Sequence, residues 1–472
     1  MRAVMLETVE IAPVGRERLS TVLQAPMREA FEAAAKEARG VLDGREVWNV
    51  NSTARGGGVA ELLRPLVGYA RGLGVDVRWG VIEGDPTFFE VTKRIHNWLH
   101  GVEGDGGALD ERARRAYEAP LARGADDLTA LLEPGDVVIL HDPQTAGMID
   151  AVRAAGASAI WRCHIGLDVP NDLAREAWAF LHPYVVGADA YVFSRRAFAW
   201  EGLDADRIHL IAPSIDAFAP KNQELDANTV AAVLHAAAIV RGDGDHRAAT
   251  FRHHDGSPGR VDRRAQMIED QPLSPADPVV LQVSRWDALK DPIGVIEGFA
   301  AHVPDAHLLY AGPAVEAVAD DPEGERVLRD AIAARDRLPE EARRRVHLAA
   351  LPMEDAEENA TIVNALQRHA RVVVQKSLAE GFGLTVAEAM WKARPVVASR
   401  IGGIQDQITD GVSGVLLDDP RNLSAYGEAL RRLLADPGSA EEMGRRARER
   451  VRDEFLSARS LLQYFALIRT LA

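Results

Sequence analysis

The sequence has fewer basic than acidic residues, 55 against 71, a single cysteine and no long apolar run. Its 472 residues carry a formal net charge of −16. Such a field repels phosphate, which disfavours a nucleic acid or an anionic membrane as the main partner. No apolar stretch approaches the length of a membrane span. The single cysteine, Cys163, cannot form an internal disulfide, and its apolar neighbours predict a buried thiol.

The first residues also lack the apolar core of a secretory signal, because Glu7 and Glu10 interrupt them. We therefore expect a cytoplasmic protein. Lysine is scarce as well, with 6 residues against 49 arginines. Lys290 and Lys376 nevertheless both lie in motif-like segments, which indicates that an ammonium group is needed there.

The chain is longer than one hydrophobic core usually supports, so two domains are expected. Short β-branched runs alternate with amphipathic stretches, which is typical of parallel sheets covered by helices on both faces. The predicted strands are 47–51, 75–82, 136–141, 159–164, 190–194 and 208–211 in the first half, and 279–284, 307–311, 346–349, 372–375 and 395–399 in the second.

This pattern predicts an α/β protein with two Rossmann-like domains. We place the first at 1–217 and the second at 218–454, with an insertion at about 222–277 that opens with a helix and continues through a polar turn. The last residues, 455–472, are predicted to form a helix that packs back on the first domain. Its apolar stripe is Leu461, Leu462, Phe465 and Ile468.

The segment 380–388, EGFGLTVAE, follows a predicted strand and runs into a helix. Gly381 and Gly383 allow the backbone to approach a ligand, and the first amides of the helix offer hydrogen-bond donors to phosphate. Glu380 precedes the helix and Glu388 lies about one turn inside it, so the two carboxylates should address different parts of an extended ligand. A nucleotide sugar has that extent.

Two cations follow the strand that opens the second domain. Arg285 and Lys290 lie in 283–292, VSRWDALKDP, at the carboxyl end of that strand. Doubly wound sheets bind ligands at this edge, so the two cations could neutralise a diphosphate leaving group.

A third loop, 50–61, joins a strand to an amphipathic helix through Gly56, Gly57 and Gly58. It is a further candidate for an anion or a sugar. The loop lacks both the Walker lysine and the dinucleotide-binding glycine spacing, which disfavours ATP hydrolysis and NAD binding.

Two Asp-x-Asp triplets, 204–206 and 243–245, could in principle ligate Mg²⁺ or Mn²⁺. Both lie in polar, loop-like segments away from the phosphate candidates, so we interpret them as solvated acids. His253 and His254 similarly suggest a polar turn. We therefore expect a protein without a metal or another cofactor.

Seven segments together resemble glycosyltransferase family four, which has the GT-B fold of two Rossmann-like domains facing a cleft. Within that family they are most similar to the trehalose glycosyltransferring synthases. The segments are 50–63 (VNSTARGGGVAELL), 88–101 (FFEVTKRIHNWLHG), 140–147 (LHDPQTAG), 161–168 (WRCHIGLD), 212–216 (APSID), 282–292 (QVSRWDALKDP) and 375–399 (QKSLAEGFGLTVAEAMWKARPVVAS).

The resemblance implies a retaining enzyme that transfers glucose from a nucleoside diphosphate glucose to free glucose, forming α,α-trehalose. It also implies a homodimer with small sugars and nucleotide sugars as its ligands. The implied catalytic residues are Glu380, Arg285, Lys290 and His164, with His164 facing the donor sugar. The implied donor-binding residues are Gly57, Gly58, Arg285, Lys290, Gly381, Phe382, Gly383, Leu384, Thr385 and Glu388, with Glu388 on the ribose. The implied acceptor-binding residues are Asn51, Lys93, His96, Asp142 and Gln144.

Two other functions remain open at this stage. A trehalose phosphorylase would use the same fold with inorganic phosphate in place of the diphosphate, although a ribose contact by Glu388 would require a nucleotide. A catalytically silent sensor of nucleotide sugars would bind the donor without turnover.

Overall fold

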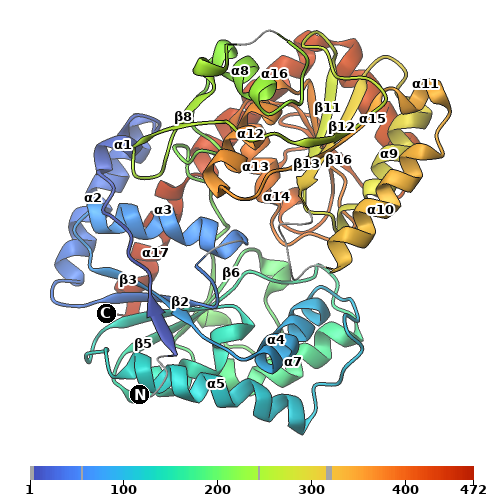
Figure 1. The fold of residues 1–472 in the computed structure, drawn as a ribbon. Helices are drawn as coiled ribbons and strands as arrows, with labels where there is room; N and C mark the ends of the chain where they lie inside the picture. Colours follow the sequence, from blue (N-terminus) through green and yellow to red (C-terminus); the bar gives the residue numbers. More distant parts are fainter. Residues whose placement is uncertain (1–4, 55–56, 243–244, 315–321, 472) are drawn as a thin grey trace. The chain divides into compact units, whose positions relative to one another are not determined.

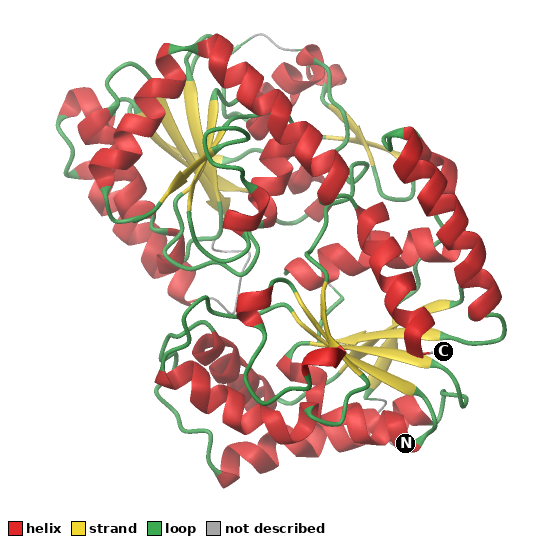
Figure 2. Cartoon of the chain, turned by 180° about the vertical axis from the view of Figure 1, so that it is seen from behind, coloured by secondary structure: helices red, strands yellow, loops and turns green. Residues whose placement is uncertain are grey.

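The computed structural model describes residues 5–54, 57–242, 245–314 and 322–471. The chain divides into two compact units, of which the first comprises Met1–Ser214 with Phe455–Ala472 and the second Ile215–Glu454. The sequence placed the boundary between 217 and 218. Figure 1 colours the chain along its length, and Figure 2 separates strands from helices.

The first unit contains one mainly parallel sheet in the order β1-β3-β2-β4-β5-β6-β7, with only β1 antiparallel. Its strands are β1 Leu6–Thr8, β2 Val47–Asn51, β3 Val77–Ile82, β4 Val137–His141, β5 Ser158–Cys163, β6 Ala190–Phe193 and β7 Ile208–Leu210. Its helices are α1 Arg16–Ser20, α2 Ala25–Val41, α3 Gly58–Gly72, α4 Pro86–Leu99, α5 Glu111–Thr129, α6 Ile149–Ala154, α7 Asp172–Val185 and α17 Ser457–Leu471.

Helices cover both faces of this sheet, as Figure 2 shows. A core of aromatic and aliphatic residues, including Phe88, Tyr117 and Trp161, joins one face to α4, α5 and α7. The C-terminal helix α17 packs against α2 and α3 of the same unit. Of its predicted apolar stripe, Leu461, Phe465 and Ile468 are buried and Leu462 is half-buried.

The second unit repeats the architecture with the strand order β10-β13-β12-β11-β14-β15-β16, in which only β10 is antiparallel. Its strands are β8 Thr250–Arg252, β9 Pro258–Arg260, β10 Gln266–Ile268, β11 Val279–Val283, β12 His307–Pro313, β13 Val346–Leu351, β14 Val372–Gln375, β15 Val396–Ser399 and β16 Val415–Leu417. Its helices are α8 Ala227–Ala236, α9 Pro292–His302, α10 Pro322–Asp336, α11 Glu340–Arg343, α12 Ala356–His369, α13 Leu384–Trp391, α14 Ile404–Gln407, α15 Leu423–Ala435 and α16 Pro437–Glu454.

Every strand predicted from the sequence is present, and the two Rossmann-like sheets confirm the predicted fold class. β1, β8, β9, β10 and β16, which have three residues each, were not predicted. A run this short carries no readable alternation, and β1 and β10 are held only by antiparallel pairing at a sheet edge. The insertion contains α8 and the β8–β9 hairpin, whose connection is the predicted polar turn.

The strand orders give one candidate ligand-binding edge in each unit. In the first sheet the order reverses between β2 and β4, and in the second between β11 and β14. Loops at the carboxyl ends of such a pair diverge to opposite faces and leave a crevice. No helix of the described residues combines the length and the apolar character needed to cross a bilayer.

Candidate functional site

In the second unit, the loops that follow β11 and β14 are tied together. The two strands pair in parallel, so both loops leave the sheet at the same edge. The side-chain amide of Gln282, which is fully buried, donates to the backbone oxygen of Lys290 at 2.8 Å and accepts from the backbone nitrogen of Lys376 at 3.3 Å. The amide of Leu378 donates to the backbone oxygen of Leu289 at 2.7 Å. The two loops therefore form one structural unit.

This arrangement brings Lys290 to Glu380. The ammonium Nζ lies 2.5 Å from Oε2 of the carboxylate, and the side chains are 14% and 13% exposed. The hydroxyl of Ser377 donates to the same oxygen at 3.3 Å. Two predicted catalytic residues, 90 positions apart in the chain, thus form a largely buried ion pair.

A second lysine, Lys376, joins the same two loops through a largely buried ion pair. Lys376 is fully buried, and its ammonium contacts Oδ2 of Asp291. Asp291 has a left-handed backbone, with φ 51°, and caps α9 by accepting from the amide of Gly294. The ammonium expected at Lys376 therefore has a structural partner at the turn that carries Lys290.

The loop 380–383 ends at the N-terminus of α13. Gly383 has φ 79°, a conformation that glycine adopts without strain, and no side chain caps the helix. The first amides of α13, at Leu384 and Thr385, thus begin a helix whose positive end suits an anion. This is the geometry that the glycine pattern predicted.

A second glycine pair holds this loop in place. Gly402 has φ 47°, and a Cβ there would lie 1.9 Å from the backbone oxygen of Glu380. The amide of Gly403 donates to the oxygen of Gly381 at 2.8 Å, and the side chain of Gln407 donates to the oxygen of Phe382 at 2.5 Å. The segment after β15 therefore supports the predicted anion loop.

Arg285 lies near the same edge but is open to solvent. Its side chain is 65% exposed, and it forms a 3.1 Å ion pair with Asp287. Trp286 beside it is buried, stacks on Tyr310 and donates to the oxygen of Pro313. The backbone that carries Arg285 is thereby anchored, while the guanidinium stays accessible.

Glu388 lies on α13 and is 5% exposed, with Oε1 3.6 Å from Nζ of Lys221. Lys392, one turn further on, donates to Asn222 Oδ1 and to the backbone oxygen of Glu388, both at 3.0 Å. Burial lowers the pKa of Lys392 well below its usual value. The contact of Glu388 with a ribose stays a prediction.

In the first unit, Asp142 and His164 meet at the edge between β4 and β5. Asp142 has φ 62° and ψ −177°, a region that is almost exclusive to glycine. Its Oδ1 accepts from the backbone nitrogen of His164 at 2.7 Å. Burial raises the pKa of Asp142 to about 7, against the opposing effects of that hydrogen bond and of Arg162. Strained backbone and perturbed carboxyl group together are typical of a functional position.

The other predicted residues of this unit are more dispersed. Asn51 ends β2, where its amide donates to the oxygen of Thr53 and accepts from the indole of Trp79, both at 2.8 Å. Gln144 follows Asp142 in a 3₁₀ turn. Lys93 is exposed and His96 half-buried, and both lie on α4. Their roles toward an acceptor stay predictions.

Gly57 and Gly58 begin α3, and Gly57 has φ 82° with no side chain capping the helix. Gly56, the first of the three glycines, lies outside the described residues. Cys163 is buried, as predicted, and its thiol contacts the oxygen of Ile165.

Within the described part of the chain, no group of three or more His, Cys, Asp or Glu residues is placed to hold a metal ion. Asp204 accepts from the amide of Asp206 and pairs with Arg207. Asp243 of the second triplet lies outside the described residues. His253 and His254 both contact Glu357 through Nδ1, which ties the hairpin turn to α12.

Gln282, Asp291 and Gly402 were not predicted as site residues, although each orders part of the predicted donor site. Asn49 and His141 were not predicted either; the side chain of His141 lies within hydrogen-bond distance of both Asn49 and His164. Asp291 could have been found, because an Asp-Pro pair before an apolar stretch is typical of a helix N-terminus. Gly402 and Gly403 also follow a predicted strand. The partners of Gln282, His141 and Asn49 are set by contacts between strands, which no local pattern encodes.

Comparison with known proteins agrees with this architecture. A family model described as "Trehalose synthase, N-terminal domain" matches residues 49–200, and one described as "Glycosyl transferases group 1" matches residues 264–450. The solved structure of an α,α-trehalose-phosphate synthase (UDP-forming) from Burkholderia vietnamiensis is similar in fold, with a TM-score of 0.65 and 16% identity, covering 90% of this chain and 98% of that one. The match to the glycosyl transferase model and the two Rossmann-like sheets together show a glycosyltransferase of the GT-B class.

Among curated relatives, a trehalose synthase from Rubrobacter xylanophilus is 37% identical over 440 residues, which cover 92% of each chain. A trehalose phosphorylase from Pleurotus sajor-caju is 27% identical, covering 78% of this chain but only 50% of that protein. The chain belongs to the trehalose synthase family.

Replacing Gly402 by alanine should disturb the anion loop. The added Cβ would collide with the backbone oxygen of Glu380, so the loop must shift, and we expect kcat/KM for glycosyl transfer to fall by about 10²-fold. Gly411→Ala is the matched control, because Gly411 also has a positive φ, 72°, but a Cβ there meets nothing within 4 Å. Equal activity in the two variants would contradict the supporting role of Gly402.

Proposed function

We propose that this enzyme transfers glucose from a nucleoside diphosphate glucose to free glucose and forms α,α-trehalose with retention of the donor's α configuration. The reaction is reversible in this proposal. The relatives support the class of product, and the residues at the edge of the second sheet support the class of donor.

The main structural support is the Lys290–Glu380 pair beside the uncapped N-terminus of α13. In a protein of net charge −16, a phosphate site must be built locally. Lys290, Arg285 and the first amides of α13 supply positive charge within the same pair of loops. A nucleoside diphosphate, whose oxygens gain charge as the sugar leaves, is the ligand that such a group stabilises.

The acceptor is assigned by exclusion and by resemblance. Many enzymes of this fold glycosylate lipid carriers at anionic bilayers, for which a strongly acidic protein is poorly suited. Small soluble acceptors remain, and the segments around Asn51, Lys93, Asp142 and His164 are those that resemble trehalose-forming members.

The proposed chemistry is displacement on the front face of the donor sugar. The bond between the anomeric carbon and the phosphate oxygen breaks, and the departing phosphate accepts the proton of the attacking hydroxyl. The hydroxyl oxygen then bonds to the anomeric carbon on the same face, which retains the α configuration. A double displacement would need a carboxylate nucleophile on the opposite face of the sugar, and the sequence motifs offer no obvious one.

Phosphorolysis of trehalose is the second candidate, because phosphorylases are among the relatives. The synthase relative matches along 92% of its length, whereas the phosphorylase matches along half, which favours the synthase reaction. Inorganic phosphate acting on trehalose without any nucleotide would support the phosphorylase.

The product provides the direct test of this function. The enzyme should convert a nucleoside diphosphate glucose and ¹³C-labelled glucose into a non-reducing disaccharide whose two α-anomeric positions share one NMR chemical shift, because α,α-trehalose is symmetric, with ¹³C in only one of the two glucose units. Testing uridine, adenosine and guanosine donors in parallel would identify the preferred nucleotide. A β linkage, a reducing product or a preference for glucose 6-phosphate would refute the assignment, and donor binding without turnover would indicate a sensor.

Lys290→Ala should lower kcat by roughly 10²–10³-fold, because one preorganised positive group is lost from the developing charge. The thermal midpoint should fall as well, because the largely buried carboxylate of Glu380 loses its partner, so kcat is compared at a temperature where both proteins are folded. Lys36→Ala, at an exposed position on α2, is the matched lysine control and should leave kcat unchanged. A Lys290 variant with wild-type kcat would place the diphosphate elsewhere.

We also expect activity to persist after treatment with EDTA. Cationic side chains and helix amides, rather than a bound metal, neutralise the leaving group in the proposed reaction. The measurement is the initial rate before and after chelation, with Mg²⁺ added back. Loss of activity on chelation and its recovery with Mg²⁺ would overturn this part of the proposal.

A further inference from the structure

A chain of hydrogen-bonded side chains lies beneath the predicted sugar-facing residue His164 of the first unit. Asn49 on β2 is followed by His141 on β4 and then by His164, which comes directly after β5. His141 Nε2 lies 3.2 Å from Asn49 Oδ1, and His141 Nδ1 lies 3.1 Å from His164 Nε2. The two imidazole rings stack with their planes 12° apart. Asn49 and His141 are 8% and 1% exposed, so the chain is shielded from solvent except at His164.

The chemistry of the groups fixes the direction of each hydrogen bond. An amide oxygen only accepts, so His141 must carry its hydrogen on Nε2 to donate to Asn49. A neutral imidazole has one hydrogen, which leaves His141 Nδ1 as an acceptor. His164 must then donate from Nε2. Its own Nδ1 is left with a lone pair and with no hydrogen-bond partner among the described residues.

The surroundings keep both rings neutral. Arg162, the residue paired with His141 across the parallel strands, is 1% exposed. Burial first, and then the charge of Arg162, lower the pKa of His141 to about 3 and that of His164 well below its usual value. The other polar neighbours from the packed elements are Asp142, which accepts from the backbone of His164, and Ser194 and Tyr464 beside Arg162.

We propose that Asn49 and His141 are positioning residues that hold His164 in its Nε2–H tautomer, so that Nδ1 accepts a hydrogen from a hydroxyl group of the bound sugar. Whether His164 Nδ1 donates or accepts is thereby determined by Asn49 on β2, two strands away from β5 in the sheet. The part of this inference that concerns a sugar rests on the proposed function, whereas the tautomer is a property of the free protein.

The tautomer is measured by nitrogen-15 NMR on the full-length protein with labelled histidine, which distinguishes ring nitrogens that carry hydrogen from those that do not. Loss of a signal in His164→Gln assigns His164. We expect Nε2 protonated and Nδ1 unprotonated at neutral pH. A hydrogen on Nδ1 of His164 would overturn the proposal. It would mean that Asn49 donates from its NH₂ group and that donor and acceptor are exchanged in both hydrogen bonds.

Two substitutions at Asn49 then test whether Asn49 and His141 set the tautomer of His164. Asn49→Leu keeps the size but removes the acceptor, so His164 should populate both tautomers. By analogy with the loss of a hydrogen-bond partner behind a metal-bound histidine, kcat/KM should fall by about 10–10²-fold. Asn49→Asp, which can only accept, should restore the single tautomer and most of the activity. An unchanged His164 tautomer in Asn49→Leu would refute the positioning role of Asn49.

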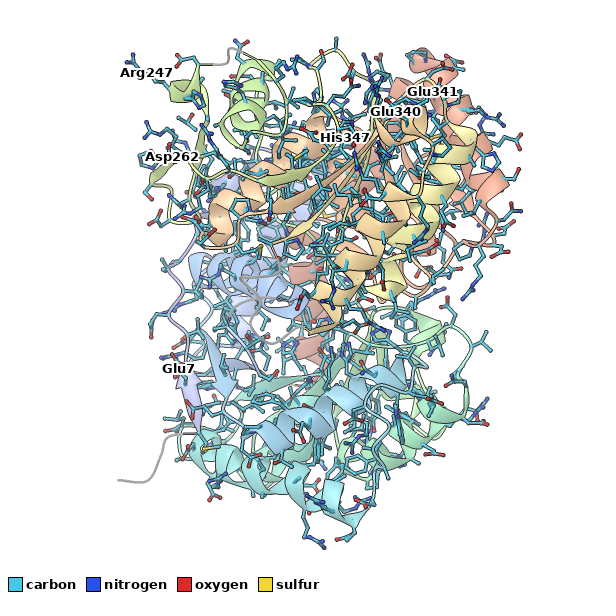
Figure 3. The ribbon with its side chains drawn as sticks, turned by 45° about the vertical axis from the view of Figure 1, so that its right-hand side comes forward. Glu7, Arg247, Asp262, Glu340, Glu341 and His347 are labelled. Atoms are coloured by element: carbon cyan, nitrogen blue, oxygen red, sulfur yellow. The ribbon has the colours of Figure 1, made fainter. Side chains whose placement is uncertain are left out.

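The second unit supplies a matched control. His307 Nδ1 lies 3.0 Å from His347 Nε2, so this unit contains another hydrogen-bonded histidine pair, of which His347 is labelled in Figure 3. His307→Gln should change neither the His164 signals nor kcat/KM. If the tautomer of His164 is as expected but no glucose is transferred, the positioning role of Asn49 and His141 is supported and the proposed function fails.

Discussion

The side-chain amide of Gln282 joins the loops that follow β11 and β14, and the candidate donor site of the second unit depends on that connection. Two of its hydrogen bonds fix the backbone at Lys290 and at Lys376. Because the loops cannot slide past each other, the ammonium of Lys290 meets Glu380 at 2.5 Å. Removal of the amide would leave two buried backbone groups without partners, at about 1–3 kcal/mol each. A neutral, fully buried residue thus determines where the charged ones lie.

The first unit positions its polar residues by a different means. Asp142 occupies a backbone conformation suited to glycine, and neighbouring groups hold it there: its amide donates to the oxygen of Arg162, its own oxygen accepts from the indole of Trp161, and its carboxylate accepts from His164. Strain of this kind persists only where several contacts overdetermine it. The same contacts place His164 against His141, so the strained turn and the histidine pair form one arrangement.

The sequence was sufficient for features that are encoded locally. Strand-to-helix periodicity predicted both sheets, and the glycines of 380–388 predicted an uncapped helix start that α13 provides. Local pattern could not predict that Lys290 and Glu380 pair with each other, since their 90-residue separation is closed by the parallel register of β11 and β14. Gly402 was missed for a related reason, because its requirement for glycine arises from a backbone oxygen of another loop. The predicted acceptor residues still await a test.

The few lysines of the second unit all take part in pairings of this kind. The second unit has four lysines, and each has an acidic or amide partner near the edge site: Lys221, Lys290, Lys376 and Lys392.

In the proposed reaction, negative charge grows on the departing diphosphate while the sugar becomes cationic. The Lys290–Glu380 pair already presents one group of each sign, and each sign can stabilise the opposite charge as it develops. Because the pair is formed before the ligand arrives, little reorganisation is needed during the reaction. An ion pair of zero net charge can therefore favour the charge-separated transition state over the ground state.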